Sequence, residues 1–409
     1  MTEVTLKTAI TLIFVAGLAA GSASRSAAGS RPADVGPVAS ATNEFGFRLL
    51  EGLCRAEPGR NVFISPASVG MALAMTLNGA AGMTRQAMAG TLGLGGVGPA
   101  DVNAGHKALK AMLVNPDPKV RLDIANSIWA HKGVSFVPAF LSTNRDYYGA
   151  ELRVLDFALP ASVGTINGWV SKSTNGRIKS IVSQLNPDVV MILINAIYFK
   201  GTWTEQFDKG LTYEQDFYLN GGQAVRVPMM HQSDRYRYWR GDGMQVVALP
   251  YGSGRLNLYL LRPDDDRSVT GLVQALATGK WQEWRSRLVM KKGDVGVPRF
   301  KLEYSVSLSR VLKELGMAVA FDPEKADFTG LLKGQQRAYI GDVLHKTFLE
   351  VNEEGTEAAA VTAVKMLATA MPAPEERFSL VLDRPFVALI FDEETGTVLF
   401  SGVINDPRS

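Results

Sequence analysis

The chain has 409 residues, of which 46% are hydrophobic and 20% charged, a composition close to that of ordinary globular proteins. This composition excludes a disordered, collagen-like or coiled-coil chain. The 43 Lys and Arg residues nearly balance the 40 Asp and Glu residues, and a net charge of only +3 argues against nucleic acid as a main partner.

The N-terminal segment differs from the rest of the chain. Lys7 precedes an apolar run at residues 9–20, and small residues follow at 21–24. This pattern is typical of a secretory signal peptide, which we place at residues 1–22, with an uncleaved anchor or a mistaken start as the alternative. Residues 23–41 are rich in Ala, Ser, Gly, Pro and Arg and predict a flexible tail before one domain at 42–409. We therefore expect a secreted or periplasmic protein, without stable membrane insertion once the signal is removed.

Hydrophobic periodicity predicts the elements of this domain in chain order. Helices are expected at residues 43–53, 68–78, 84–92, 138–148 and 165–173. Strands are expected at residues 61–64, 122–131, 189–194, 245–250, 256–261, 295–300, 385–391 and 398–403. The continuous apolar run at 189–194 indicates a strand buried on both faces, deep in a sheet. Because strands outnumber helix–strand alternations, the pattern favours a mixed α+β fold over a doubly wound one.

The motifs that carry chemistry give no support for an enzyme. Cys54 is the one cysteine and is expected as a buried thiol, so an intrachain disulfide or a multi-Cys zinc site is excluded. Residues 93–98 match GxGxxG, but they follow a helical pattern and precede Pro99, which predicts a plain loop. The aspartates at 264–266 lack the ligand spacing of a calcium loop. We predict no catalytic residues, no metal site and no cofactor.

The segment 353–372 has an unusual alternation. Starting at Thr356, every second residue is small or apolar and uncharged, whereas Glu357 and Lys365 both fall in the other set. A period of two suits a strand with one buried face. Ala and Glu are also good helix formers, so composition alone leaves helix and strand evenly matched. The Pro and Glu residues at 372–376 cannot continue a central strand, which predicts an exposed loop at this end.

Several long motifs, in the right order, resemble those of the serpin family. They lie at residues 61–68, 195–203, 353–362, 383–386 and 399–402, and the resemblance covers about residues 43–407. It implies an α+β fold with three β-sheets, eight or nine helices and an exposed reactive-centre loop at about 353–376. In inhibitory members a protease cleaves this loop and forms an acyl-enzyme. The loop then inserts as a new strand into the large sheet and traps the protease before deacylation.

The resemblance also assigns residues to the regions that control insertion. The hinge comprises Glu353, Gly355, Thr356, Glu357, Ala358, Ala359 and Ala360. The shutter, a polar cluster under the centre of the large sheet, comprises Ser65, Ser68, Asn195 and His345. The breach, where insertion begins, comprises Trp203, Arg299 and Glu353, with a Glu353–Arg299 ion pair as a hypothesis. Gly355 permits a bend, and Thr356 is small and uncharged where the first inward side chain would be buried, which favours an inhibitory member.

Counting from Gly355 with the family's usual spacing predicts the reactive bond at Thr369–Ala370, with Ala368 or Met371 involved if the register shifts. A small side chain there suits the shallow specificity pocket of an elastase-like or subtilisin-like serine protease. We therefore expect a monomer that forms a covalent complex with such a protease and is not itself an enzyme. The alternatives are a binding or chaperone protein on the same fold, and a secreted hydrolase with an unrecognised site.

Overall fold

The computed structural model describes residues 34–265, 267–334, 337–356 and 376–408. The predicted signal peptide and most of the predicted tail lie outside these residues. So do the far part of the hinge and the candidate reactive bonds, namely Glu357, Ala358, Ala359, Ala360, Ala368, Thr369, Ala370 and Met371. Within the described part of the chain, no helix is long and apolar enough to cross a membrane.

Helices form where apolar residues recur at helical spacing behind a suitable first residue. Pro stands at one of the first two positions of α1, α2, α4, α5 and α6, where its missing N–H costs no hydrogen bond. The α-helices of the described residues are α1 Gly36–Ala56, α2 Pro66–Leu77, α3 Gly82–Thr91, α4 Pro99–Leu113, α5 Pro138–Thr143, α6 Pro160–Ser173, α7 Val269–Ala277, α8 Trp281–Ser286 and α9 Ser309–Leu312. Short π-helices extend α5 at Asn144–Tyr148 and α9 at Lys313–Met317, and 3-10 helices lie at Lys209–Leu211 and Ala318–Phe321.

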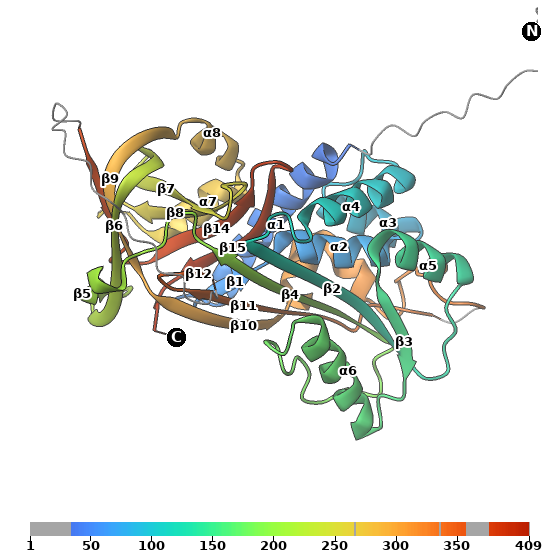
Figure 1. Cartoon of the computed structure of the whole chain (residues 1–409). Coiled ribbons are helices and arrows are strands. Elements are labelled where there is room, and N and C mark those ends of the chain that lie inside the picture. Colours follow the sequence, from blue (N-terminus) through green and yellow to red (C-terminus); the bar gives the residue numbers. More distant parts are fainter. Residues whose placement is uncertain (1–33, 266, 335–336, 357–375, 409) are drawn as a thin grey trace, which may run out of the picture. The chain divides into compact units, whose positions relative to one another are not determined.

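The strands of the described residues form two hydrogen-bonded sheets (Figure 1). Six strands make the first sheet, in the order β10-β11-β4-β2-β3 with β12 on β4, and nine make the second, in the order β1-β15-β14-β8-β7-β6-β9-β13 with β5 on β6. The strands are β1 Val62–Ile64, β2 Val120–His131, β3 Glu151–Leu155, β4 Met191–Thr202, β5 Thr212–Tyr218, β6 Ala224–Gly241, β7 Met244–Tyr251, β8 Leu256–Pro263, β9 Val289–Pro298, β10 Phe300–Ser307, β11 Asp342–Val351, β12 Gly355–Thr356, β13 Phe378–Val381, β14 Phe386–Asp392 and β15 Thr397–Ile404.

The mixed α+β class is confirmed, and the sheet count differs from the expected three for a physical reason. The first half of β6 pairs with β5, at residues 224–230, and its second half pairs with β7, at residues 237–241. The strand β9 follows β6 across both halves, from Val289 to Pro298. The long strand β6 thus joins two smaller sets of strands into a single sheet.

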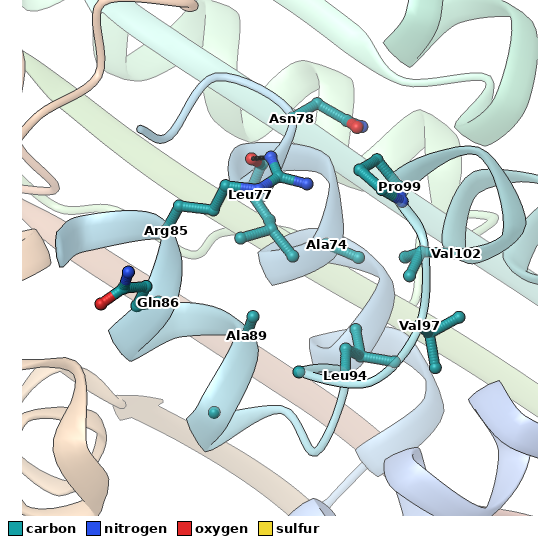
Figure 2. Close-up of a pocket in the computed structure, with 12 residues that line it drawn as sticks. Ala74, Leu77, Asn78, Arg85, Gln86, Ala89, Leu94, Val97, Pro99 and Val102 are labelled. Atoms are coloured by element: carbon teal, nitrogen blue, oxygen red, sulfur yellow. Dashed lines mark hydrogen bonds between the residues drawn. The ribbon is translucent and has the colours of Figure 1, made fainter. Parts of the chain in front are cut away.

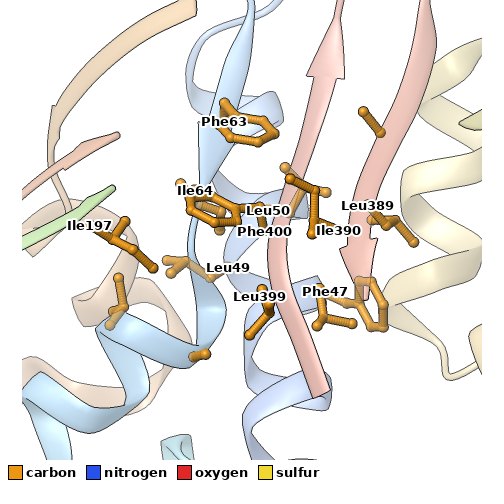
Figure 3. Close-up of a cluster of buried hydrophobic side chains, with 14 of the residues drawn as sticks. Phe47, Leu49, Leu50, Phe63, Ile64, Ile197, Leu389, Ile390, Leu399 and Phe400 are labelled. Carbon is orange, nitrogen blue, oxygen red and sulfur yellow. The ribbon is translucent and has the colours of Figure 1, made fainter. Parts of the chain in front are cut away.

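The strand β4 lies between two layers of helix, as its apolar run predicts. Ile192 and Ile194 join a cluster with Ile166 of α6, whereas Leu193 and Ile197 belong to the main core on the opposite face. Figure 3 shows Ile197 near the aromatic and aliphatic side chains of β1 and β15. Residues 191–199 are all buried, which confirms a strand covered on both faces.

The N-terminal boundary of the domain was wrong in the sequence prediction. The helix α1 begins at Gly36, inside the range 23–41 that was predicted as tail, and Val38, Ala39 and Ala41 are buried. Val38 lies against Gly105 of α4, where an added Cβ would come within 3.0 Å of it. Small residues at 36–41 therefore allow close helix packing, although their composition resembles that of a linker.

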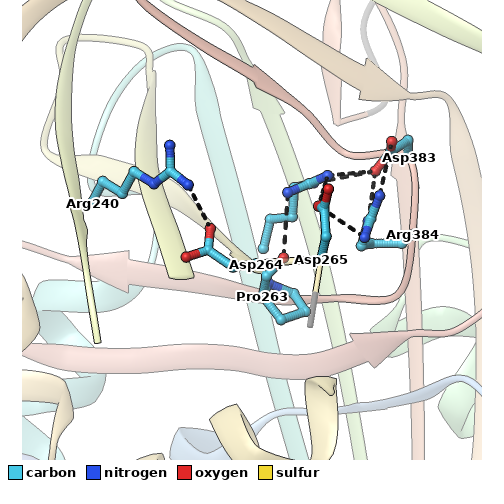
Figure 4. A network of polar contacts seen from close by, with 7 residues as sticks. Arg240, Pro263, Asp264, Asp265, Asp383 and Arg384 are labelled. Carbon is cyan, nitrogen blue, oxygen red and sulfur yellow. Dashed lines mark hydrogen bonds and ion pairs between the residues drawn. The ribbon is translucent and has the colours of Figure 1, made fainter. Parts of the chain in front are cut away.

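The two motifs that were set aside as chemically inert are built into ordinary structure. Residues 93–98 form the connection between α3 and α4, so the glycine-rich match is a loop. Asp264 pairs with Arg240 at 3.3 Å, and Asp265 pairs with Arg262 at 3.1 Å and with Arg384 at 2.9 Å (Figure 4). These carboxylates are thus engaged by guanidinium groups.

Candidate functional site

The two central strands of the six-stranded sheet, β4 and β11, are paired over only part of their length. Their parallel register runs from Ile192 opposite Asp342 to Tyr198 opposite Phe348. Beyond this point, β12 pairs with β4 instead, with Gly355 opposite Thr202 and Thr356 opposite Gly201. The other edge of β4 is occupied by β2 as far as Gly201, so β12 lies on the side of β11. The chain after β11 has therefore already placed two residues in the gap where the strands part.

Gly355 makes the sharp reversal between β11 and β12 possible. The turn is closed by hydrogen bonds from the Asn352 N–H to the Gly355 carbonyl at 3.0 Å and from the Gly355 N–H to the Asn352 carbonyl at 3.2 Å. Gly355 has a φ of 140°, and an added Cβ would lie 2.1 Å from the carbonyl oxygen of Gly201. Glycine alone fits this position, because any side chain would collide with the backbone of β4.

Thr356 is buried where β12 pairs with β4, beside the hydroxyl of Tyr251. Its side chain is fully buried, and its hydroxyl lies 2.9 Å from the hydroxyl of Tyr251. Tyr251 stacks on Trp203 with ring centroids 4.3 Å apart, and the Trp203 indole N–H donates to the Asn352 carbonyl at 2.9 Å. Burial raises the pKa of Tyr251, so its phenol stays protonated and can donate. The hinge therefore begins in a site that fits a small hydroxyl side chain.

Glu353, in the turn between β11 and β12, has a nearly fully buried carboxylate. It is 2% exposed, it forms an ion pair with Arg299, and it accepts a hydrogen bond from the Thr212 hydroxyl at 2.9 Å. Burial opposes ionisation, but the Arg299 and Thr212 hydrogen bonds outweigh it and hold the pKa of Glu353 below its usual range. The hypothesis of a Glu353–Arg299 pair is confirmed, and Trp203 lies in the same region.

We expect Glu353→Gln to destabilise the native state by about 1–3 kcal/mol at pH 7, because a buried charge-assisted bond is lost. The lowered pKa of Glu353 means that its contribution is complete above the unfolded value of 4.5 and is lost as the pH falls through the lower folded value. Urea unfolding at pH 7 and pH 4 measures both effects. Glu354→Gln is the control, since Glu354 forms an ion pair with the exposed Lys209, and the change should cost less than about 1 kcal/mol. Equal losses in the two variants would contradict the anchoring role.

A polar row crosses the centre of the same sheet, in the middle of the β4–β11 pairing. Asn126, Asn195 and His345 lie opposite one another on β2, β4 and β11. The side-chain amide of Asn195 donates to the side-chain oxygen of Asn126 and to the Ser68 hydroxyl of α2. The predicted shutter residues are thus brought together in a fully buried cluster, with Ser65 capping α2 beside them.

The hydrogen bonds of His345 fix its protonation state. The Ser65 N–H donates to Nε2 of His345 at 3.1 Å, so this nitrogen must be unprotonated. Nδ1 then carries the proton and donates to the Asn195 side-chain oxygen at 2.6 Å. Burial lowers the pKa of His345 to about 3, which keeps the ring neutral. The imidazole therefore joins α2 to the strands β4 and β11, and both of its ring nitrogens are engaged in these hydrogen bonds.

The sequence analysis missed three residues of this arrangement, namely Asn126, Thr212 and Tyr251. Asn126 had a detectable signal, because it shares the inward parity of the apolar residues Leu122 and Ile124 in the predicted strand. A buried amide at such a position indicates a polar partner. Thr212 and Tyr251 carried no such signal, since their contacts arise only when β5 and β7 meet the hinge.

These features define a class of protein: a mixed-sheet molecule whose central parallel strands part at one end and hold the start of the following segment between them. A family model described as serpin (serine protease inhibitor) matches residues 40–407. The chain therefore belongs to the serpin family.

Relatives and solved structures agree with this assignment. Human leukocyte elastase inhibitor is 35% identical over 90% of this chain and 99% of its own length, and an uncharacterized serpin-like protein of Thermococcus kodakarensis is 37% identical over 91% and 86%. The native structure of the thermophilic serpin tengpin has a TM-score of 0.83 and 32% identity over 90% of this chain and 93% of its own. Human thyroxine-binding globulin complexed with thyroxine has a TM-score of 0.84 and 27% identity over 92% of this chain and 100% of its own.

Proposed function

We propose that this serpin is an exported inhibitor of a serine endopeptidase of elastase-like or subtilisin-like specificity. The observation that carries the proposal is the parting of β4 from β11 with Gly355 and Thr356 already seated between them. An open position in a sheet is the structural requirement for strand addition, and the hinge occupies its first two places.

The proposed inhibition begins as ordinary proteolysis. The hydroxyl of the protease serine attacks the carbonyl carbon of Thr369, an ester forms, and the amide bond to Ala370 breaks. The protease histidine takes the serine proton and passes it to the departing amine of Ala370. The two proteins are then joined as an acyl-enzyme. The outcome depends on whether hydrolysis of the ester or insertion of the loop is faster.

Insertion needs the paired part of β4 and β11 to open. Their register over residues 192–198 and 342–348 must separate, and so must the His345–Asn195 hydrogen bond across it. A strand inserted between them would pair on both sides and replace the bonds that are broken. About 15 inserted residues at roughly 3.3 Å each would move the attached protease on the order of 50 Å.

The target class and the location rest on sequence features. Ala368, Thr369 and Ala370 are all small, which fits a shallow specificity pocket, and one relative is named a leukocyte elastase inhibitor. Residues 1–22 have the signal-peptide pattern that supports export to the periplasm or the medium. We propose a monomer in which one loop meets one protease.

Incubation with pancreatic elastase is expected to give an SDS-stable complex of protein and protease, together with a released C-terminal peptide that begins at Ala370. N-terminal sequencing of the peptide and gel electrophoresis measure both products. Elastase with its catalytic serine blocked is the control and should give neither. A peptide that begins outside residues 366–371 would refute the placement of the bond, and cleavage without a complex would refute inhibition.

A second candidate is a serpin that binds or chaperones another molecule without inhibiting a protease. The likeness to a hormone-binding globulin in complex with its ligand favours keeping it. The two functions differ in how the protein responds to cleavage of its loop. An inhibitor that inserts its loop should gain a large amount of thermal stability on cleavage, whereas a binding protein without insertion should keep its melting temperature.

A further inference from the structure

A cavity of about 430 Å³ lies away from the hinge, between the helices α2, α3 and α4 (Figure 2). Its walls are mainly apolar and include Leu77 of α2, Ala89 of α3, Val102 of α4, and Leu94 and Val97 of the loop between α3 and α4. This size falls within the range of small-molecule sites, which are mostly apolar with a few polar groups that fix the ligand's orientation.

One cationic side chain lines this cavity. Arg85 extends from α3 toward the end of α2, and its guanidinium donates one hydrogen bond of 3.2 Å to the Leu77 carbonyl (Figure 2). No acidic group of the described residues forms an ion pair with Arg85, although a guanidinium has five N–H donors in a fork that matches a carboxylate. The half-buried Arg85 thus has donors to spare at the edge of an apolar space.

The side-chain amide of Asn78, which also lines the cavity, is already hydrogen-bonded within the protein. The side chains of Asn78 and Asn103 donate to each other at 3.0 Å in both directions, and Tyr148 adds a hydrogen bond of 2.7 Å to Asn103. This closed network fixes the cavity wall and leaves Arg85 as the group that would recognise a charge.

We propose that this cavity binds a medium-chain organic carboxylate, with its chain against the apolar walls and its carboxylate on Arg85. An apolar body gains free energy from burial in the cavity, and a paired carboxylate satisfies the guanidinium with charge-assisted bonds. A neutral ligand would forgo those bonds, and an inorganic anion would gain nothing from the apolar walls. The site is independent of the reactive loop and of the proposed inhibition.

Titration calorimetry of the whole protein with decanoate tests the proposal. We expect saturable binding of one decanoate, at least about tenfold weaker binding of decan-1-ol, and no binding of decylammonium. Arg85→Gln should weaken decanoate binding at least about tenfold while leaving decan-1-ol unchanged within about twofold, and Arg85→Lys should restore part of the loss.

A cavity-filling pair locates the site. Ala89→Leu places a larger side chain in the cavity wall and should abolish decanoate binding, whereas Ala87→Leu makes the same change on α3 outside the lining and should bind normally. Equal affinities in this pair, or binding of decylammonium as tight as that of decanoate, would overturn the proposal. An absence of saturable decanoate binding to the unmodified protein would overturn it as well, and that result does not require any variant to fold.

Discussion

If the protein acts as the proposed inhibitor, Thr356→Arg is expected to turn it into a substrate of elastase. Thr356 of the hinge is fully buried, and its hydroxyl lies against that of Tyr251. An arginine cannot occupy this pocket without burying an unpaired charge, which costs several kcal/mol. In the proposed mechanism insertion of the loop begins at this residue, so the penalty falls on the step that competes with hydrolysis of the acyl-enzyme. Each 1.4 kcal/mol of added barrier slows insertion about tenfold.

The stoichiometry of inhibition measures this competition. We expect the number of molecules consumed per elastase inactivated to rise at least about tenfold in Thr356→Arg, with cleaved protein accumulating and little SDS-stable complex. Thr356→Ser keeps the hydroxyl that faces Tyr251 and should inhibit within about twofold of the unmodified protein. If the arginine variant inhibited as efficiently as the serine variant, the seated hinge would not be the start of an inserting strand.

The elements that the sequence predicted well are those whose burial pattern is local. The apolar run before Asn195 needs two covered faces whatever its partners are, and it became β4. The strand β6 was missed, because its alternating burial is interrupted at residues 230–232 and its two halves pair with different neighbours. The start of α1 was misplaced because Ala and Gly residues that permit close helix packing have the composition of a linker.

In the candidate site, too, features that depend on distant neighbours could not be predicted from local sequence patterns. The motif residues Ser65, Asn195 and His345 could be assigned to one cluster only through the family resemblance, since they lie on elements that are far apart in sequence. What no motif indicated is how they are joined, with His345 accepting from the Ser65 backbone and donating to Asn195. That detail depends on the register of β4 against β11 and on the position of α2, both of which are set by tertiary packing.

Acid should weaken the native state well above the pH at which carboxylates titrate. The folded-state pKa of His345 is lowered to about 3, against 6.5 for an exposed histidine, so protonation favours the unfolded chain. The stability due to the neutral ring is complete above pH 6.5 and is lost progressively below it. From pH 7 to pH 5 the loss is about 2 kcal/mol for such a group. His106 is buried with its pKa lowered to about 4 and should add a similar loss.

Replacing His345 by glutamine separates the two contributions. A glutamine side chain offers one acceptor for the Ser65 N–H and one donor for the Asn195 oxygen, so His345→Gln keeps the hydrogen-bond pattern without a titrating group. We expect the decrease in unfolding free energy between pH 7 and pH 5, measured by urea unfolding, to shrink by about half in this variant. His106→Gln should shrink it by a similar amount, and the double variant should keep only a residual sensitivity, part of it from His231, whose pKa burial also lowers. An undiminished acid sensitivity in His345→Gln would show that the imidazole can be protonated without opening the contact between α2 and the central strands.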